Sequence, residues 1–196
     1  MIDRKIFFDR IRSSVFGGSL KQSQVNGFTA ILDAWDDSGL VDLRWLAYMC
    51  GTITFETAYT VQPIKEHGGD SYFFRMYDKS GSRPAVAKAL GNTTPGDGVK
   101  YSGRGFVQLT GRTNYERMSV VTGVDLVANP DLAMQPDIAT KILFYGMENG
   151  SFTSKKLTDF FNDKTDWVGA RKIINGQDKA TEIAQLAIKF YEALQN

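Results

Sequence analysis

The best candidate for acid–base chemistry in this sequence is a glutamate that ends an apolar stripe. Leu46, Met49, Ile53 and Glu56 recur at intervals of three or four residues, which is the spacing of one helix face. A carboxyl group among apolar neighbours tends to keep its proton, and the C-terminal end of a helix dipole also disfavours the ionised form. Glu56 is therefore a candidate general acid. The alternative is an ordinary surface glutamate just outside the core face of its helix.

A second concentration of chemically capable side chains occupies residues 101–115. Gly103, Gly105 and Gly111 allow tight turns and a close approach of ligand to backbone. Around them lie side chains that donate or accept hydrogen bonds, namely Tyr101, Arg104, Gln108, Thr110, Arg112, Asn114 and Tyr115. This inventory suits a neutral ligand rich in hydroxyl and amide groups, such as an amino sugar. A glycine-rich turn leading into a helix would explain the same residues, and on chemistry alone both interpretations stay open.

Residues 101–115 also resemble the signature Tyr-x-Gly-Arg-Gly-x-x-Gln-Leu-(Thr/Ser)-x-x-x-Asn-Tyr of family 19 glycoside hydrolases, with every fixed position filled. That family comprises plant-type chitinases and a large group of bacteriophage endolysins and bacterial cell-wall lytic enzymes. The resemblance implies that Gln108 and Asn114 bind N-acetyl and hydroxyl groups of the sugar, and that Thr110 helps to hold the nucleophilic water. It further implies that Tyr101 lines the cleft and that Arg104 braces the site.

Glycoside hydrolysis needs one acid to protonate the leaving oxygen and usually a second carboxylate to activate water or attack the sugar. Residues 50–58 resemble the family's helix ending in His-Glu-Thr, where the glutamate is the general acid, so the resemblance assigns that role to Glu56. Phe55 stands where most relatives have histidine, which removes one polar neighbour of the acid. Residues 62–66 resemble the Pro-(Ile/Val)-x-Glu segment of the phage members, which makes Glu66 the second carboxylate.

Alternatives to these assignments remain on the same loop. Glu66 could be a solvated charge beside Lys65, and Asp70 and Asp78 are reserve candidates for the second carboxylate. In an inverting enzyme, as the family's chitinases are, the two carboxyl groups should lie roughly 6.5–9.5 Å apart to leave room for a water. Near the end of the chain, residues 170–176 resemble an Arg-x-Ile-Asn-Gly segment whose asparagine reaches the substrate. Asn175 is thus expected to bind substrate, with a helix C-cap as its other possible role.

Helices must position most of these groups. Apolar spacing and capping signals predict helices over residues 20–37, 42–62, 83–90, 114–123, 137–148, 153–162, 165–175 and 178–194, and a short strand over residues 106–110. The first of these would begin at a capping box opened by Ser19, and Pro63 would end the second. Gly51 lies inside the second helix at a cost of roughly 1 kcal/mol relative to alanine, which predicts a close neighbour there. Residues 64–100 otherwise look irregular and are expected to form one wall of a cleft.

The predicted fold class is α+β and mostly α-helical. The resemblance implies a single lysozyme-like catalytic domain with two lobes around a central substrate cleft. A helical lobe would contain about residues 1–62 and 113–196, and a smaller loop-and-sheet lobe about residues 63–112.

The amino-acid composition argues against several classes of function. The 196 residues include 23 basic and 22 acidic side chains, a net charge of +1, which gives no case for a nucleic-acid binder. The single cysteine, Cys50, excludes an internal disulfide, and His67 as the lone histidine gives no metal-binding cluster, so no metal or cofactor is expected. The start of the chain lacks the apolar run of a signal peptide, and no run could span a membrane, so we expect synthesis and folding in a cytoplasm.

These observations favour a bacteriophage endolysin that cleaves the β-1,4 bonds of peptidoglycan, with a muramidase preferred to a chitinase. Residues 18–27 resemble the opening helix of such endolysins. We expect a monomer made in the host bacterial cytoplasm that binds the peptidoglycan glycan strand after release by a holin-type partner, with no nucleic acid and no stable membrane insertion. The alternatives are a chitinase that hydrolyses N-acetylglucosamine polymers and a non-enzymatic carbohydrate-binding or virion structural protein that has kept the fold.

Overall fold

The computed structural model of the protein describes residues 2–195, which form mostly helices and one small sheet of two strands. This agrees with the predicted α+β class. The chain divides into two compact units, one formed by residues 1–62 and 143–196 and the other by residues 63–142. The sequence analysis assigned residues 113–142 to the helical lobe, whereas these residues pack with the second unit.

The first unit is built from long helices. They are α1 (Arg4–Ser14), α2 (Gln22–Ser38), α3 (Leu43–Glu56) and α9 (Ala180–Leu194), together with the later part of α8 (Pro136–Asn149) and the short 3-10 helices η2 (Leu157–Asp159) and η3 (Gly169–Ile173). Phe7, Phe28 and Phe190 are fully buried, and their rings pack against one another with centroids 5.3–6.3 Å apart. These three rings tie α1, α2 and α9 into one aromatic core.

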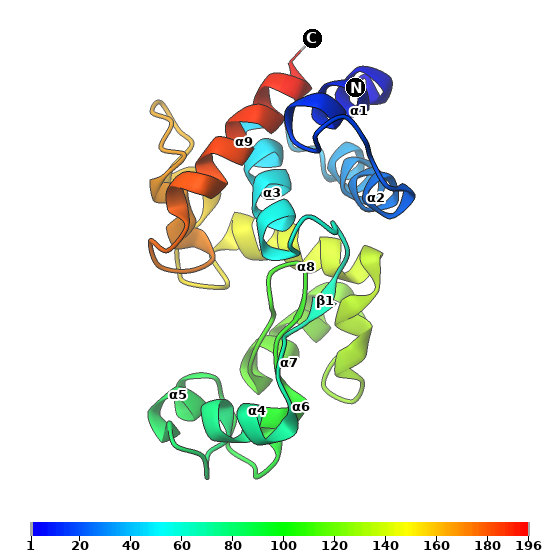
Figure 1. Cartoon of the computed structure of the whole chain (residues 1–196). Helices are drawn as coiled ribbons and strands as arrows, with labels where there is room; N and C mark the ends of the chain where they lie inside the picture. Colours follow the sequence, from blue (N-terminus) through cyan, green and yellow to red (C-terminus); the bar gives the residue numbers. More distant parts are fainter. Residues whose placement is uncertain (1, 196) are drawn as a thin grey trace. The chain divides into compact units, whose positions relative to one another are not determined.

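Helix α3 packs closely along α9, and the cyan and red ribbons of Figure 1 follow this pairing. A Cβ on Gly51 would stand 2.8 Å from the backbone nitrogen of Ala187 in α9. Only a glycine lets the two backbones come this near, which confirms that the glycine inside the predicted helix marks a close neighbour.

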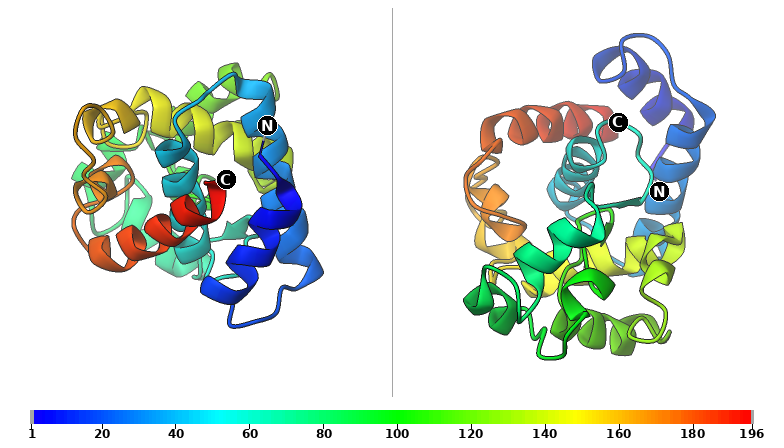
Figure 2. Two further views of the ribbon diagram at one scale, coloured as in Figure 1. Left: turned by 90° about the horizontal axis from the view of Figure 1, so that it is seen from above. Right: turned by 60° about the horizontal axis from the view of Figure 1, so that its bottom comes forward.

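The second unit can be followed in the green part of the ribbon in Figure 2. Its elements are β1 (Ile64–Lys65), α4 (Asp70–Tyr77), α5 (Pro84–Ala89), α6 (Asp97–Lys100), β2 (Arg104–Gly105), α7 (Arg112–Thr122) and η1 (Pro130–Met134), followed by the start of α8. The two strands are antiparallel, with Ile64 opposite Gly105 and Lys65 opposite Arg104. This short pairing joins the segment after α3 to the glycine-rich stretch.

The predicted strand over residues 106–110 is wrong, because the strand ends at Gly105 and the chain turns back. The backbone nitrogens and carbonyls of Arg104 and Leu109 bond to each other at 3.2 and 2.8 Å. Gly105 and Gln108 have φ values of +93° and +55°, which belong to a turn and not to a strand. Alternation of apolar and polar residues in so short a run does not distinguish the two.

Two helix boundaries also differ from the prediction. Helix α2 is capped at Lys21 and not at Ser19, with the Lys21 N–H donating to Oε1 of Gln24 at 2.7 Å. Helix α3 ends at Glu56, well before Pro63. The predicted helices over residues 83–90, 114–123, 137–148 and 178–194 correspond to α5, α7, α8 and α9. Those predicted over residues 153–162 and 165–175 are wrong in length and type, because the chain forms only the short 3-10 helices η2 and η3 there.

Helices α4 and α6 lie within residues 64–100, which the sequence analysis expected to be irregular apart from residues 83–90. The short α4 is rich in aromatic residues of modest helix propensity and has no side-chain cap at Gly69, so its local signal is weak. Burial of Phe73 holds it in place. Among residues 2–195, no helix has both the length and the apolar character that crossing a membrane requires.

Candidate active site

Glu56 is the last residue of α3, and its helix is fixed at both ends. At the start, Asp42 accepts a hydrogen bond from the backbone N–H of Arg44 at 3.0 Å. Along the helix, Leu46, Met49 and Ile53 are fully buried, as the apolar stripe predicts. Burial of this helix face therefore fixes the orientation of the helix end that carries Glu56.

The turn after Glu56 has an unusual backbone. Ala58, Tyr59 and Val61 have φ values of +48°, +64° and +54°, a region that residues with a Cβ rarely adopt. The Thr57 hydroxyl accepts from the N–H of Val61 at 2.9 Å, and the Gln24 amide donates to the carbonyl of Tyr59 at 2.8 Å. Such strain persists only where surrounding contacts enforce it, and it is typical of functional sites.

The Glu56 carboxylate pairs with a guanidinium. Arg171 Nη1 donates to Glu56 Oε1, and the exposed fractions of the two side chains are 5% and 19%. The Nε of the same arginine donates to the carbonyl of Asp178 at 3.0 Å, which orients the guanidinium. Apolar groups were expected around this carboxyl, but its hydrogen-bond partner in the structure is a buried cation.

The sequence reasoning missed Arg171. It lies in η3, 115 positions from Glu56, inside the segment that was singled out for Asn175. The available signal was an arginine between apolar residues, Ala170 before it and Ile173 after Lys172, since a buried arginine rarely lacks a partner. Asn175 itself is exposed and accepts from the N–H of Gly176 at 2.8 Å, and Phe55 is half-buried.

In the second unit, Glu66 follows β1 and is held on both carboxylate oxygens. Tyr77 of α4 donates its hydroxyl to Oε1 at 2.8 Å, and the backbone N–H of Gly103 donates to Oε2 at 3.1 Å. The backbone N–H of Glu66 donates in turn to the carbonyl of Gly103 at 2.8 Å. These contacts make Glu66 an ordered carboxylate and not a mobile loop charge.

Tyr77 is a neutral donor in this arrangement. Its burial, together with the hydrogen bond to Glu66, raises the pKa of Tyr77 well above its usual value. The hydroxyl therefore keeps its proton and donates it to the carboxylate throughout the neutral range. The two groups that donate to Glu66, the Tyr77 hydroxyl and the Gly103 N–H, are therefore both uncharged.

Gln108 lies beside Glu66 around Gly103. A Cβ on residue 103 would stand 2.7 Å from Oε1 of Gln108 and 2.9 Å from Oε2 of Glu66, so a larger residue there would displace the ends of these two side chains. The Gln108 amide donates to the carbonyl of Ile64 at 3.3 Å. Its Oε1 is buried and has no hydrogen-bond partner among residues 2–195, which is rare for a buried amide oxygen.

Thr110 and Asn114 continue from Gln108 in a chain of hydrogen bonds. The Thr110 hydroxyl donates to the carbonyl of Gln108 at 2.8 Å, and the Asn114 amide donates to the carbonyl of Thr110 at 2.7 Å. Both side chains are half-buried. The Thr110 oxygen keeps lone pairs that can accept from a water, and the Asn114 oxygen can accept from a sugar.

Arg104 and Tyr101 are structural members of this stretch. Arg104 is 5% exposed and donates to Asp131 at 2.6 Å, to the carbonyls of Lys100 and Ser102, and to the Tyr115 hydroxyl. Burial raises the pKa of Tyr115 to about 12, against the opposing charge of Arg104. Tyr101 is fully buried with its hydroxyl on the carbonyl of Val127, so it does not line a cleft as expected.

Asp70 and Asp78, the two reserve candidates for the second carboxylate, have other roles in the structure. Asp70 is exposed in the first turn of α4. Asp78 is fully buried and accepts from the backbone N–H groups of Ser80, Gly96 and Gly98 at 2.8–3.3 Å. Asp78 thus holds a loop together, and Glu66 is the better placed of the three for chemistry.

The structure therefore gathers the predicted residues into two groups. In the first unit Glu56 is joined by Arg171, and in the second unit Glu66, Gln108 and Thr110 lie close along the glycine-rich stretch. The first group offers a carboxyl with a cationic neighbour. The second offers a carboxylate, a hydroxyl and an amide oxygen that can hold a water or a sugar.

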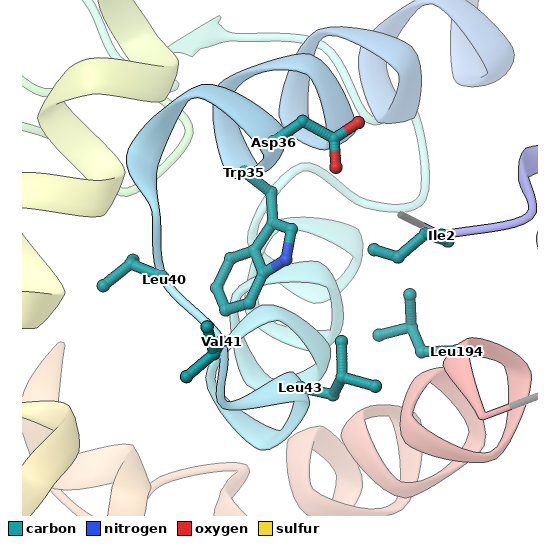
Figure 3. Close-up of a pocket in the computed structure, with 7 residues that line it drawn as sticks. All are labelled: Ile2, Trp35, Asp36, Leu40, Val41, Leu43 and Leu194. Atoms are coloured by element: carbon teal, nitrogen blue, oxygen red, sulfur yellow. The ribbon is translucent and has the colours of Figure 1, made fainter.

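The first unit also contains a pocket of about 330 Å³ that neither Glu56 nor Arg171 lines. It is lined by Ile2, Trp35, Asp36, Leu40, Val41, Leu43 and Leu194, and Figure 3 shows the apolar side chains around the Trp35 indole. Asp36, its one carboxylate, pairs with Arg4 at 2.8 Å. No predicted site residue lines this pocket, so its chemistry does not suit bond cleavage.

Comparison with known proteins identifies the relatives of this chain. The model of glycoside hydrolase family 19, described as chitinase class I, matches residues 37–154. The crystal structure of chitinase C from Streptomyces griseus HUT6037 is similar, with a TM-score of 0.62 and 19% identity over 98% of this chain and 76% of that one. The crystal structure of a chitinase C mutant gives a TM-score of 0.60 and 20% identity, over 98% and 92%. These similarities confirm the predicted fold class, and no curated protein matches.

Proposed function

This chain belongs to glycoside hydrolase family 19, and from this premise we propose that it cleaves the β-1,4 glycosidic bonds of bacterial peptidoglycan. The bond proposed is the one between N-acetylmuramic acid and N-acetylglucosamine, as in a muramidase. Glu56 would act as the general acid and Glu66 as the base.

The observation that carries the proposal is the way Glu66 is held. Two neutral donors, Tyr77 and the Gly103 N–H, fix both of its oxygens, while the unpartnered oxygen of Gln108 lies beside it. A carboxylate oriented in this way can remove a proton from a water, and an amide oxygen can accept a bond from a sugar N-acetyl group.

The proposed reaction is a single displacement. Glu56 gives its proton to the glycosidic oxygen as the bond from that oxygen to the anomeric carbon breaks. A water held by Thr110 attacks that carbon and passes a proton to Glu66. Both carboxyl groups then return to their starting states by exchange with solvent, and the product has inverted stereochemistry.

The preference for peptidoglycan comes from two segments that resemble phage members of the family. Residues 62–66 carry the second carboxylate only ten positions after Glu56, and residues 18–27 resemble the opening of phage endolysins. The proposal includes an endolysin that acts as a monomer and reaches the wall from the host cytoplasm with the help of a holin-type partner.

Purified Gram-negative sacculi provide the direct test. The protein should release soluble muropeptides, and mass spectrometry should find N-acetylmuramic acid at the new reducing ends. Glu56→Gln and Glu66→Gln should each lower the rate by about 100-fold or more, within the range for a positioned acid or base. Asp70→Asn, a matched change at an exposed carboxylate, should keep the wild-type rate. Full activity of the Glu56→Gln variant would refute the acid assignment.

A chitinase is the second candidate, because the matching family model is described as chitinase class I. Release of chitooligosaccharides from colloidal chitin, with no activity on sacculi, would replace the first proposal by this one. The roles of Glu56 and Glu66 would stay the same, since both substrates are β-1,4-linked amino sugars.

A further inference from the structure

A polar stripe runs along α3 and ends at Glu56. Tyr48, Thr52 and Glu56 are four residues apart, so they lie on one face of the helix. Tyr48 and Thr52 are fully buried. Two hydroxyl groups therefore lie in the core of the first unit, one and two helical turns before the carboxyl group.

Neither hydroxyl oxygen has a hydrogen-bond partner in the part of the chain that the structure describes. Burying a polar group without a partner costs free energy, so such groups are rare and call for an explanation. The Thr52 and Tyr48 hydroxyls are close enough to interact, but their geometry does not make a full hydrogen bond. Both oxygens remain able to accept.

The charged groups around the Tyr48 hydroxyl are Arg171, Glu56 and Asp166, and Arg171 acts on it most strongly. Burial raises the pKa of Tyr48 well above its usual value, against the opposing effect of Arg171. The hydroxyl therefore stays neutral, with lone pairs available to a cation. The same guanidinium is bonded to Glu56 and is 5% exposed.

This arrangement addresses a conflict in the proposed chemistry. A general acid must carry its proton before the bond breaks, whereas a buried guanidinium favours the carboxylate. When Glu56 is protonated, Arg171 loses the charge of its partner. The Tyr48 and Thr52 oxygens, on the same face of α3, are then unpartnered buried acceptors.

We propose that Arg171 exchanges between two partners during the reaction, the hydroxyls of Tyr48 and Thr52 while Glu56 is protonated and the Glu56 carboxylate after the proton has left. The inference rests on the proposed function, in which Glu56 is the acid. Tyr48 and Thr52 are positioning residues, since they act on Glu56 through Arg171 and touch no substrate.

The exchange follows the proton through one catalytic cycle. Glu56 gives its proton to the leaving oxygen, becomes a carboxylate, and gains the guanidinium as the charge appears. Uptake of a proton from solvent then releases Arg171 to the hydroxyls. The arginine thereby stabilises the product state of proton transfer without holding the resting acid in its ionised form.

A crystal structure of the Glu56→Gln variant tests the exchange without any activity measurement, because the amide is neutral like the protonated acid. We expect the Arg171 guanidinium within hydrogen-bond distance of Tyr48 Oη or Thr52 Oγ1. A guanidinium that stays on the side chain of residue 56 would overturn the proposal.

The pH dependence of kcat on purified sacculi gives a second test with the Tyr48→Phe/Thr52→Val variant. Without the hydroxyls Arg171 stays on Glu56 and favours the carboxylate, so activity should be lost at lower pH. We expect the alkaline limb to move down by roughly half to one pH unit, the equivalent of one hydrogen bond, with KM unchanged. An unmoved alkaline limb would overturn the proposal.

The control is Thr54→Val, since Thr54 is equally buried on the same helix but donates to the Cys50 carbonyl at 2.7 Å. It should lower the Tm and leave the pH profile in place. The Tyr48→Phe and Thr52→Val single variants should keep or raise the Tm, because each removes an unpartnered hydroxyl.

The two proposals fail in different ways. If the wild-type protein is inactive on both sacculi and chitin, the proposed function is refuted. If the wild type is active but the pH profile of the Tyr48→Phe/Thr52→Val variant equals that of the wild type, only the exchange is refuted.

Discussion

At the scale of single residues, the two carboxyl groups have opposite surroundings. Glu56 has a cationic partner in Arg171, whereas both oxygens of Glu66 accept from uncharged donors. The two glutamates therefore differ in the charge of the groups that hold them.

The hydroxyl of Tyr77 should matter for catalysis more than for stability. Tyr77→Phe leaves Glu66 with one donor, and a hydrogen bond to a charged group contributes about 1.5–3 kcal/mol. We expect kcat on sacculi to fall about tenfold or more.

The matched control for that change is Tyr145→Phe, because Tyr145 is a surface residue in α8 with 36% of its side chain exposed. Its kcat and pH profile should equal those of the wild type. Equal activity of the Tyr77→Phe and wild-type proteins would mean that Glu66 does not depend on this hydroxyl.

At the scale of elements, the α3–α9 contact fixes the helix that carries Glu56. Gly51→Ala should destabilise the protein by about 1–2 kcal/mol, because overpacking of about 1–3 kcal/mol exceeds the helix propensity gained. Thermal unfolding should show a lower Tm. Gly176→Ala is the control, since nothing lies within 4 Å of the added Cβ and its Tm should be unchanged. A higher Tm for Gly51→Ala would contradict the close contact.

The start of α7 depends on a buried ion pair. Asp97 accepts from Arg112 at 2.7 and 3.0 Å and from the Thr94 N–H at 3.0 Å. Burial works to raise the pKa of Asp97, but these hydrogen bonds outweigh it and hold the pKa below its usual value. The pair holds the first residue of the helix that follows the glycine-rich stretch.

The Asp97→Asn variant should lose about 1–3 kcal/mol at pH 7, less than for a fully buried pair because Arg112 is 26% exposed. The contribution of the carboxylate is present above the unfolded pKa of about 3.9 and is lost as pH falls through the lower folded value. Urea unfolding should therefore show a gap between wild type and variant that narrows below about pH 4. A gap independent of pH would contradict the ionic origin, and exposed Asp70→Asn should show no gap.

At the scale of the whole molecule, the first unit is formed by two separate stretches of chain, and the second unit lies between them in sequence. Helix α8 is continuous across the division, with Ile138 and Ile142 in the second unit and Leu143 and Met147 in the first, all four buried. Unfolding of one unit therefore disturbs a helix that the other unit needs for its core.

This continuity predicts one cooperative transition. The three tryptophans, Trp35, Trp45 and Trp167, all belong to the first unit, so their fluorescence reports on that unit alone. We expect the fluorescence Tm to equal the far-UV circular dichroism Tm, and the Asp97→Asn change in the second unit to lower both equally. A fluorescence transition that Asp97→Asn leaves in place would show that the units unfold independently.

Much of this protein could be predicted from its sequence because the signals are local. The stripe from Leu46 to Glu56 predicts α3 through helical spacing, Gly51 marks a close contact, and the signature over residues 101–115 identifies the family. Each depends on residues a few positions apart, where backbone geometry converts spacing directly into position.

The partners of the carboxyl groups were decided only by the tertiary structure. Arg171 meets Glu56 across 115 positions, and Tyr77 reaches Glu66 from a helix that local pattern did not predict. The N–H of Gly103 reaches Glu66 across 37 positions, and the burial of Tyr101 likewise depends on tertiary packing. Contacts between distant residues depend on how helices pack, and packing is a property of the folded chain as a whole.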